Sequence, residues 1–224
     1  MNLTELNLYV HIISGFLALS CGAVAIFTKK GKGIHVKAGQ IYFWSMIAVA
    51  VTALYLSIVN TIPFLFLIAI FSYYLTWTGY KNIHWKNKPL PTYIYWFDVL
   101  ITHIVALFGI AMIVLAALSW MGIHFNETIS SLNIVLMVFG VGTLIFSGED
   151  LMSFYKKSND SKFLWMYLHI GRMLGAYIAT FTAFLVVNDQ FFPSPLIAWL
   201  APTVFGTPLI FYWIRRYRLK LEPH

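Results

Sequence analysis

Long apolar segments alternate with short polar stretches along the whole chain. Each segment is continuously apolar and does not switch between apolar and polar positions at every second residue, which favours membrane-crossing helices over barrel strands. Since a helix needs about 20 apolar residues to cross the hydrocarbon, the pattern predicts seven spans. They are residues 8–28, 38–60, 62–80, 96–119, 132–155, 164–187 and 195–214. We therefore expect an all-α, polytopic membrane helical bundle that forms a single transmembrane domain, residues 1–224.

Composition strengthens this interpretation. The chain is 60% hydrophobic and only 10% charged, whereas a soluble domain carries about 25% charged residues. So few charges cannot cover a surface that faces water. The composition therefore argues against a soluble fold, a disordered tail and a nucleic-acid-binding domain, and it makes the lipid bilayer the expected partner.

The positive charges predict how the bundle is oriented. Of the 15 Lys and Arg residues, all but one follow the first, third, fifth or seventh predicted span. These residues are Lys29, Lys30, Lys32, Lys37, Lys81, Lys86, Lys88, Lys156, Lys157, Lys162, Arg215, Arg216, Arg218 and Lys220. Because cytoplasmic loops carry an excess of Lys and Arg, the N-terminus is predicted outside and the C-terminus in the cytoplasm, in the inner membrane of a cell. The net charge of +7 is thus explained by topology and needs no nucleic-acid partner.

The remaining basic residue, Arg172, lies inside the sixth predicted span. A charge at membrane depth is costly and usually faces a partner or a cavity. Glu149 and Asp150, near the end of the fifth span, are expected at a similar depth, and Asp98 lies near the start of the fourth. Two compatible interpretations stay open. Either Arg172 pairs with a carboxylate and joins two spans, or these groups line a site in which Glu149, Asp150 and Arg172 are the candidate catalytic residues.

Several histidines fall on the same predicted side of the membrane. His103 and His169 lie within about two turns of the cytoplasmic ends of their spans, and His35 lies just before the second span. Two imidazoles from different helices can ligate a haem iron, and glycines near a histidine leave space for a flat porphyrin. His103 and His169 are therefore the predicted ligands of a b-type haem, in a protein that exchanges electrons with a membrane quinone.

Two alternatives remain. A catalytic zinc held by His35, His103 and His169 would keep a position open for water, as in a membrane hydrolase that acts on lipid. In that enzyme Glu149 or Asp150 would be a ligand or the general base. The other alternative is a cofactor-free transporter or assembly factor, in which Arg172 and the carboxylates form a gate or a proton path. The sequence does not predict an oligomeric state.

Residues 11–46 and 169–184 resemble a bacterial family of predicted multi-pass membrane proteins of unknown function. The family pattern is a His-x-x-x-Gly helix, a short basic loop and a second His-x-x-x-Gly-x-x-Tyr segment. The matching positions are His11, Gly15, His35, Gly39, Tyr42, Met46, His169 and Met173. The layout is also similar, more loosely, to b-type membrane cytochromes. The resemblance implies a multi-pass membrane protein and brings no established activity with it.

Overall fold

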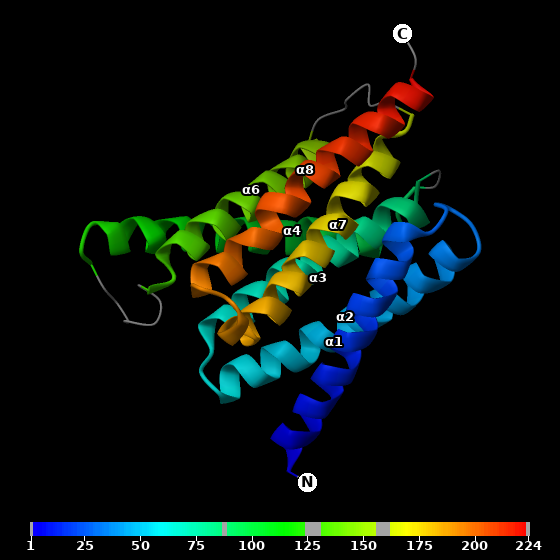
Figure 1. Ribbon diagram of the computed structural model, residues 1–224. Helices are drawn as coiled ribbons and strands as arrows, with labels where there is room; N and C mark the ends of the chain where they lie inside the picture. Colours follow the sequence, from blue (N-terminus) through cyan, green and yellow to red (C-terminus); the bar gives the residue numbers. More distant parts are fainter. Residues whose placement is uncertain (1, 87–88, 124–130, 156–161, 223–224) are drawn as a thin grey trace. The chain divides into compact units, whose positions relative to one another are not determined.

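The computed structural model describes residues 2–86, 89–123, 131–155 and 162–222, and within these ranges it is built from helices alone (Figure 1). The α-helices are α1 (Leu3–Phe27), α2 (Ile34–Val59), α3 (Pro63–His84), α4 (Thr92–Trp120), α6 (Asn133–Tyr155), α7 (Leu164–Val187) and α8 (Pro195–Leu221). A short 3₁₀ helix, η1, covers Asp189–Phe191. The predicted all-α class is confirmed. Of the basic loop residues, Lys88, Lys156 and Lys157 lie outside the described residues.

Six of these helices are long and apolar enough to cross a membrane, namely α1, α2, α4, α6, α7 and α8. The predicted multi-pass membrane character is therefore confirmed. The helix α3, which covers residues 63–80 of the predicted span 62–80, is not in this group. Ser72, Thr76 and Thr78 are buried, and each hydroxyl donates to the carbonyl oxygen four residues earlier. Such self-bonded hydroxyls suit a helix enclosed by other helices.

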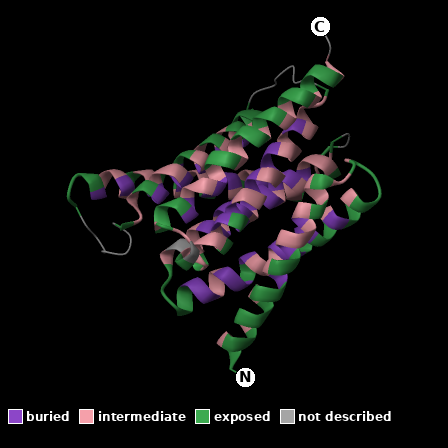
Figure 2. Ribbon diagram, viewed as in Figure 1, coloured by how far each residue is buried: buried purple, intermediate pink, exposed green. Residues whose placement is uncertain are grey.

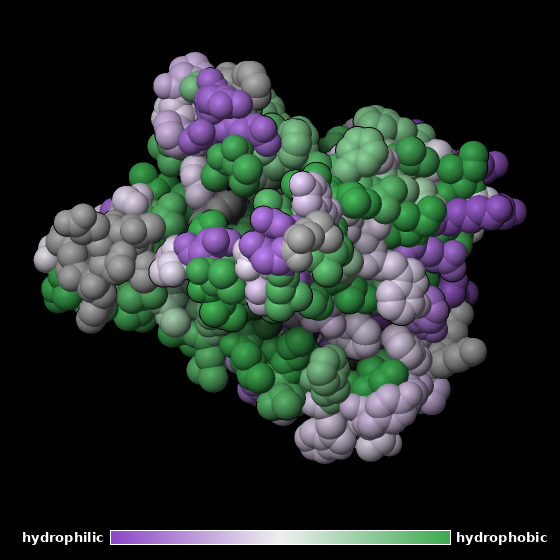
Figure 3. Space-filling model, turned by 90° about the horizontal axis from the view of Figure 1, so that it is seen from below, coloured by the Kyte–Doolittle hydropathy of each residue, from purple (hydrophilic) through white to green (hydrophobic). Residues whose placement is uncertain are grey.

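The outer surface is apolar, as a lipid-facing surface must be. Large side chains such as Phe16 and Phe205 remain 70% and 78% exposed. Figure 2 shows that α1 is mostly exposed. Hydrophobic side chains also cover much of the face seen in Figure 3, where hydrophilic ones form smaller groups.

The helices belong to two compact units. Unit 1 comprises residues 1–84 and 163–224, and unit 2 comprises residues 85–162. In unit 1, α3 lies between α2 and α7, while α1 packs on α2 and α8 packs on α7. Unit 2 is the pair α4 and α6.

Candidate functional site

His169 on α7 is held by a backbone carbonyl of a neighbouring helix. Its Nδ1 lies 2.9 Å from the carbonyl oxygen of Gly79 on α3. Because a carbonyl can only accept, Nδ1 carries the proton and Nε2 keeps its lone pair. His169 is therefore fixed in the tautomer that can ligate a metal through Nε2.

The contact between α7 and α3 requires glycine at position 79. A Cβ atom there would lie 2.9 Å from the Met173 sulfur and 3.0 Å from Cβ of Arg172. The two helices thus approach closely at a residue without a side chain, as small residues allow in membrane bundles. Arg172 itself is buried in this region of unit 1, with 1% of its side chain exposed.

His35 is held in the same way at the start of α2. Its Nδ1 lies 2.9 Å from the carbonyl oxygen of Ala25, in the last turn of α1. Carbonyls in a last turn have no helical donor, so they are available to other groups. By the same reasoning as for His169, Nδ1 carries a proton, so in the neutral tautomer Nε2 is the nitrogen that can bind a metal.

Lys30 completes the end of α1. Its ammonium donates to the carbonyl oxygen of Ala25 at 2.8 Å and to that of Ile26. This cation also complements the negative end of the helix dipole. Gly31 and Gly33, with φ of 78° and 53°, turn the short loop so that α2 starts beside the end of α1. Partial burial lowers the pKa of the Lys30 ammonium below its ordinary value.

These groups lie together at one end of unit 1. His35 and Lys30 are both close enough to His169 to interact with it electrostatically. We call His35, His169, Lys30 and Gly79 the imidazole site. Among the described residues, neither His35 nor His169 has a hydrogen-bond partner at Nε2. In the part of the chain that the structure describes, the site therefore contains two imidazoles without a hydrogen-bond partner at Nε2, beside one cation.

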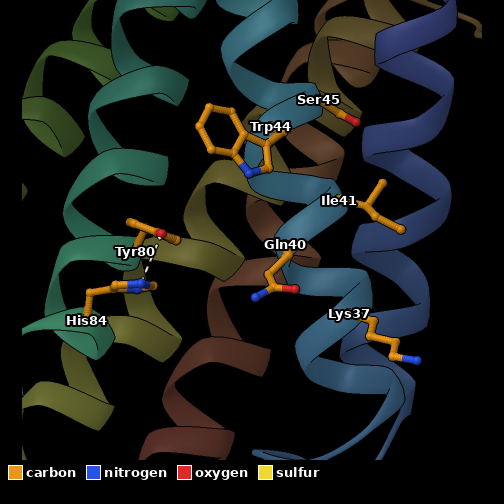
Figure 4. A pocket seen from close by; sticks show the side chains of 7 residues that line it. All are labelled: Lys37, Gln40, Ile41, Trp44, Ser45, Tyr80 and His84. Carbon is orange, nitrogen blue, oxygen red and sulfur yellow. Dashed lines mark hydrogen bonds between the residues drawn. The ribbon is translucent and has the colours of Figure 1, made fainter.

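A groove lies between α2 and α3 (Figure 4). It has a volume of about 650 Å³ and is lined by Lys37, Gln40, Ile41, Trp44, Ser45, Tyr80 and His84. We call it the α2–α3 groove. Gln40 and Trp44 extend from α2 toward α3 in this view. Tyr80 directly follows Gly79, so the groove begins one residue from the His169 contact.

The floor of the groove is an aromatic stack. The Tyr80 ring lies between Phe43, at 3.8 Å between centroids, and His84, at 4.2 Å. The Tyr80 hydroxyl is 3.1 Å from Nε2 of His84. The groove thus combines flat apolar faces with hydrogen-bonding groups.

His103 has a different environment. It belongs to unit 2, where its Nδ1 lies 2.7 Å from the carbonyl oxygen of Val99 and its Nε2 lies 3.2 Å from the Tyr155 hydroxyl on α6. Both ring nitrogens are therefore engaged. Asp150, in the same unit, is buried, while Glu149 is exposed. The predicted pairs of His103 with His169, and of Arg172 with Glu149 or Asp150, join residues of different units and stay predictions.

No group of three or more His, Cys, Asp and Glu side chains among the described residues is arranged to hold a metal ion. The predicted zinc ligands are divided between the units, with His35 and His169 in unit 1 and His103 in unit 2. A zinc centre therefore gains no support from this arrangement.

His11, which matches the first histidine of the family pattern, lies apart from the imidazole site. Its Nδ1 is 3.0 Å from the Thr52 hydroxyl, which donates its own hydrogen to the Ala48 carbonyl. His11 is about 21 Å along α1 from Ala25, given a rise of about 1.5 Å per residue. This contact ties α1 to α2 near their other ends.

Sequence reasoning identified the two histidines but not the groups that orient them. Gly79 was missed because nothing in the sequence distinguishes it from a glycine that packs against lipid. Lys30 was assigned only to the basic loops. No protein-family model, curated protein or solved structure matches the chain, so the case for a function rests on this geometry.

Proposed function

We propose that the imidazole site binds a b-type haem through Nε2 of His35 and Nε2 of His169, and that the protein exchanges electrons with a membrane quinone. The observation that carries the proposal is the shared tautomer of the two rings. Each Nδ1 proton is donated to a backbone carbonyl. In metal sites such a bond fixes the orientation of a ligating histidine and raises its basicity.

This proposal keeps His169 as a ligand and assigns the second position to His35. His35 belongs to the same unit and lies within electrostatic range of His169. His103 is less suitable because its Nε2 already accepts a hydrogen bond from Tyr155. A haem held by His35 and His169 would supply one-electron transfer.

The α2–α3 groove is the proposed quinone site. A quinone ring is flat and apolar, and its carbonyl oxygens accept hydrogen bonds. The groove supplies the Trp44 ring for stacking, with Lys37 and Gln40 as donors. Reduction of a quinone takes two electrons and two protons. In this proposal the bonded pair Tyr80 and His84 passes protons to the quinone oxygens.

Localisation follows from the same picture. The imidazole site and the α2–α3 groove lie beside basic residues of the loops, among them Lys30 and Lys37. Under the positive-inside rule this end faces the cytoplasm. The proposal therefore has electrons exchanged at the cytoplasmic side of a cell inner membrane.

The test is haem content measured on matched histidine variants. The protein is produced with haem in excess, and haem per chain is determined by pyridine haemochrome assay. We expect about one haem per chain in the wild type, because His35 and His169 form one pair of ligands. His35→Ala and His169→Ala should each lose it.

The controls are His84→Ala, which alters the groove at the same end of unit 1, and His103→Ala. Both should retain haem. Haem that depends on His103 and not on His35 would overturn the assignment of ligands. A wild type that carries no haem would overturn the proposal altogether and leave the bond of His169 to Gly79 as a helix contact.

A further inference from the structure

A second groove of unit 1 lies between α1, α7 and α8, and Lys30 of the imidazole site is at one end of it. It has a volume of about 400 Å³ and is lined almost entirely by carbon. The main lining side chains are Phe27, Leu174, Phe181, Phe205 and Leu209. We call it the α1–α8 groove. Tyr177 also lines it, and the Tyr177 hydroxyl is bonded to the Leu19 carbonyl.

The shape of the groove follows from α8. Pro202 and Gly206 both line it, and Gly206 lets α8 approach α7 closely. A Cβ atom at position 206 would lie 2.5 Å from Cδ1 of Ile178. One wall of the groove is therefore set by the close contact of α8 with α7 at Gly206.

Two cations and a tryptophan lie where the groove ends. The Lys30 ammonium is 5.6 Å from the centre of the Trp213 ring, and the Arg216 guanidinium is 5.4 Å from it. These contacts join the loop after α1 to the last turns of α8. Lys30 is bonded to the last turn of α1, which contains Phe27, and Leu209 lies about one helical turn before Trp213, so the charged cluster is next to the apolar lining.

Both cations have donors to spare. An ammonium has three N–H donors, and Lys30 donates two of them to carbonyl oxygens of α1. A guanidinium has five, and Arg216 gives one contact to the Tyr212 hydroxyl. Tryptophan is enriched at the level of lipid headgroups, which is where we expect Trp213 to lie.

We propose that the α1–α8 groove is a binding site for an anionic phospholipid. One acyl chain lies along α7 between α1 and α8, and the phosphate accepts hydrogen bonds from Lys30 and Arg216. The positive charges of Lys30 and Arg216 favour an anionic lipid over a neutral one. A neutral isoprenoid would fill the groove equally well but gives two cations nothing to bind, whereas a phosphate gives both of them acceptors. This inference does not depend on a bound haem.

The test is native mass spectrometry of the delipidated full-length protein with equal amounts of phosphatidylglycerol and phosphatidylcholine. We expect one phosphatidylglycerol to bind in preference to phosphatidylcholine. Arg216→Gln should weaken phosphatidylglycerol binding about fivefold and leave phosphatidylcholine unchanged. Arg216 is exposed, so its replacement should not disturb folding.

The matched control is Arg218→Gln. Arg218 lies on the same helix, but its guanidinium is 5.3 Å from the Tyr167 ring and not at Trp213. This variant should bind as the wild type does. Equal binding of the two lipids, equal loss in both arginine variants, or displacement of phosphatidylglycerol by a neutral isoprenoid quinone would overturn the proposal.

Discussion

His35 and His169 receive their orientation from carbonyl oxygens on other helices. Ala25 is available because it lies in the last turn of α1, and Gly79 because no side chain separates it from α7. Each bond places a proton on Nδ1 and leaves Nε2 as the available nitrogen. The orientation of both rings thus depends on backbone carbonyls and not on other side chains.

Lys30 should give the protein a pH-dependent stability. Its pKa is lowered by burial below the ordinary 10.5. Between the lowered value and 10.5 the unfolded chain binds more protons than the folded chain, so the free energy of unfolding rises with pH in this window. We expect the stability of the wild type relative to Lys30→Met to increase as pH rises through the window and to be constant below it.

Thermal unfolding in detergent at a series of alkaline pH values measures this difference. Lys29→Met removes a charge from the same loop and is the matched control. If the unfolding free energy of the wild type minus that of Lys30→Met stays flat or falls as pH rises across the window, the burial of Lys30 is contradicted.

At the scale of helices, the packing of α3 against α7 should be sensitive to one methyl group added at Gly79. In Gly79→Ala the new Cβ must displace Met173 or the backbone near Arg172. We expect a loss of about 1–3 kcal/mol in unfolding free energy, as for other overpacked cores. Gly39→Ala on α2 is the control, since a Cβ there meets nothing within 4 Å. Denaturation midpoints in detergent compare the two variants, and equal midpoints would refute the close contact.

Unit 2 offers the same comparison between α4 and α6. A Cβ at Gly140 would lie 2.8 Å from Cγ1 of Ile113 and 3.1 Å from the Gly109 carbonyl oxygen. Gly140→Ala should therefore destabilise the protein, again by about 1–3 kcal/mol. Gly148→Ala, eight residues along α6 with open space around it, should be neutral or slightly stabilising because Ala favours helix. A larger loss of unfolding free energy in Gly148→Ala than in Gly140→Ala would contradict the packing of α4 on α6 described above.

Helix positions could be predicted from the sequence, but helix neighbours could not. Apolar runs long enough to cross a membrane are visible directly, and only their ends shifted, as in α8, which continues to Leu221 beyond the predicted residue 214. Packing is not visible in this way, because Gly79, Gly140 and Gly148 look alike in the sequence and differ only in what surrounds them. For the same reason the sequence predicts that His35, His103 and His169 share one membrane face, but it does not say which of them lie next to each other.

At the scale of the whole molecule, the orientation of the two ends depends on α3. Seven crossings put the N-terminus and the C-terminus on opposite sides of the membrane, whereas six would put them on the same side. Because α3 lies between α2 and α7, we expect it to cross with them. Alkaline phosphatase, which is active only outside the cytoplasm, should be active when fused before residue 1 and inactive when fused after residue 224. The same result at both ends would contradict seven crossings.

The central claim is that His35 and His169 hold a haem. The most direct measurement is the absorption spectrum of the purified protein, oxidised and then reduced with dithionite, compared with that of His35→Ala. Two histidine ligands should give a Soret band that shifts on reduction and sharp α and β bands, all absent from the variant. A colourless wild type from haem-replete cells, or a spectrum that His35→Ala leaves unchanged, would contradict the claim.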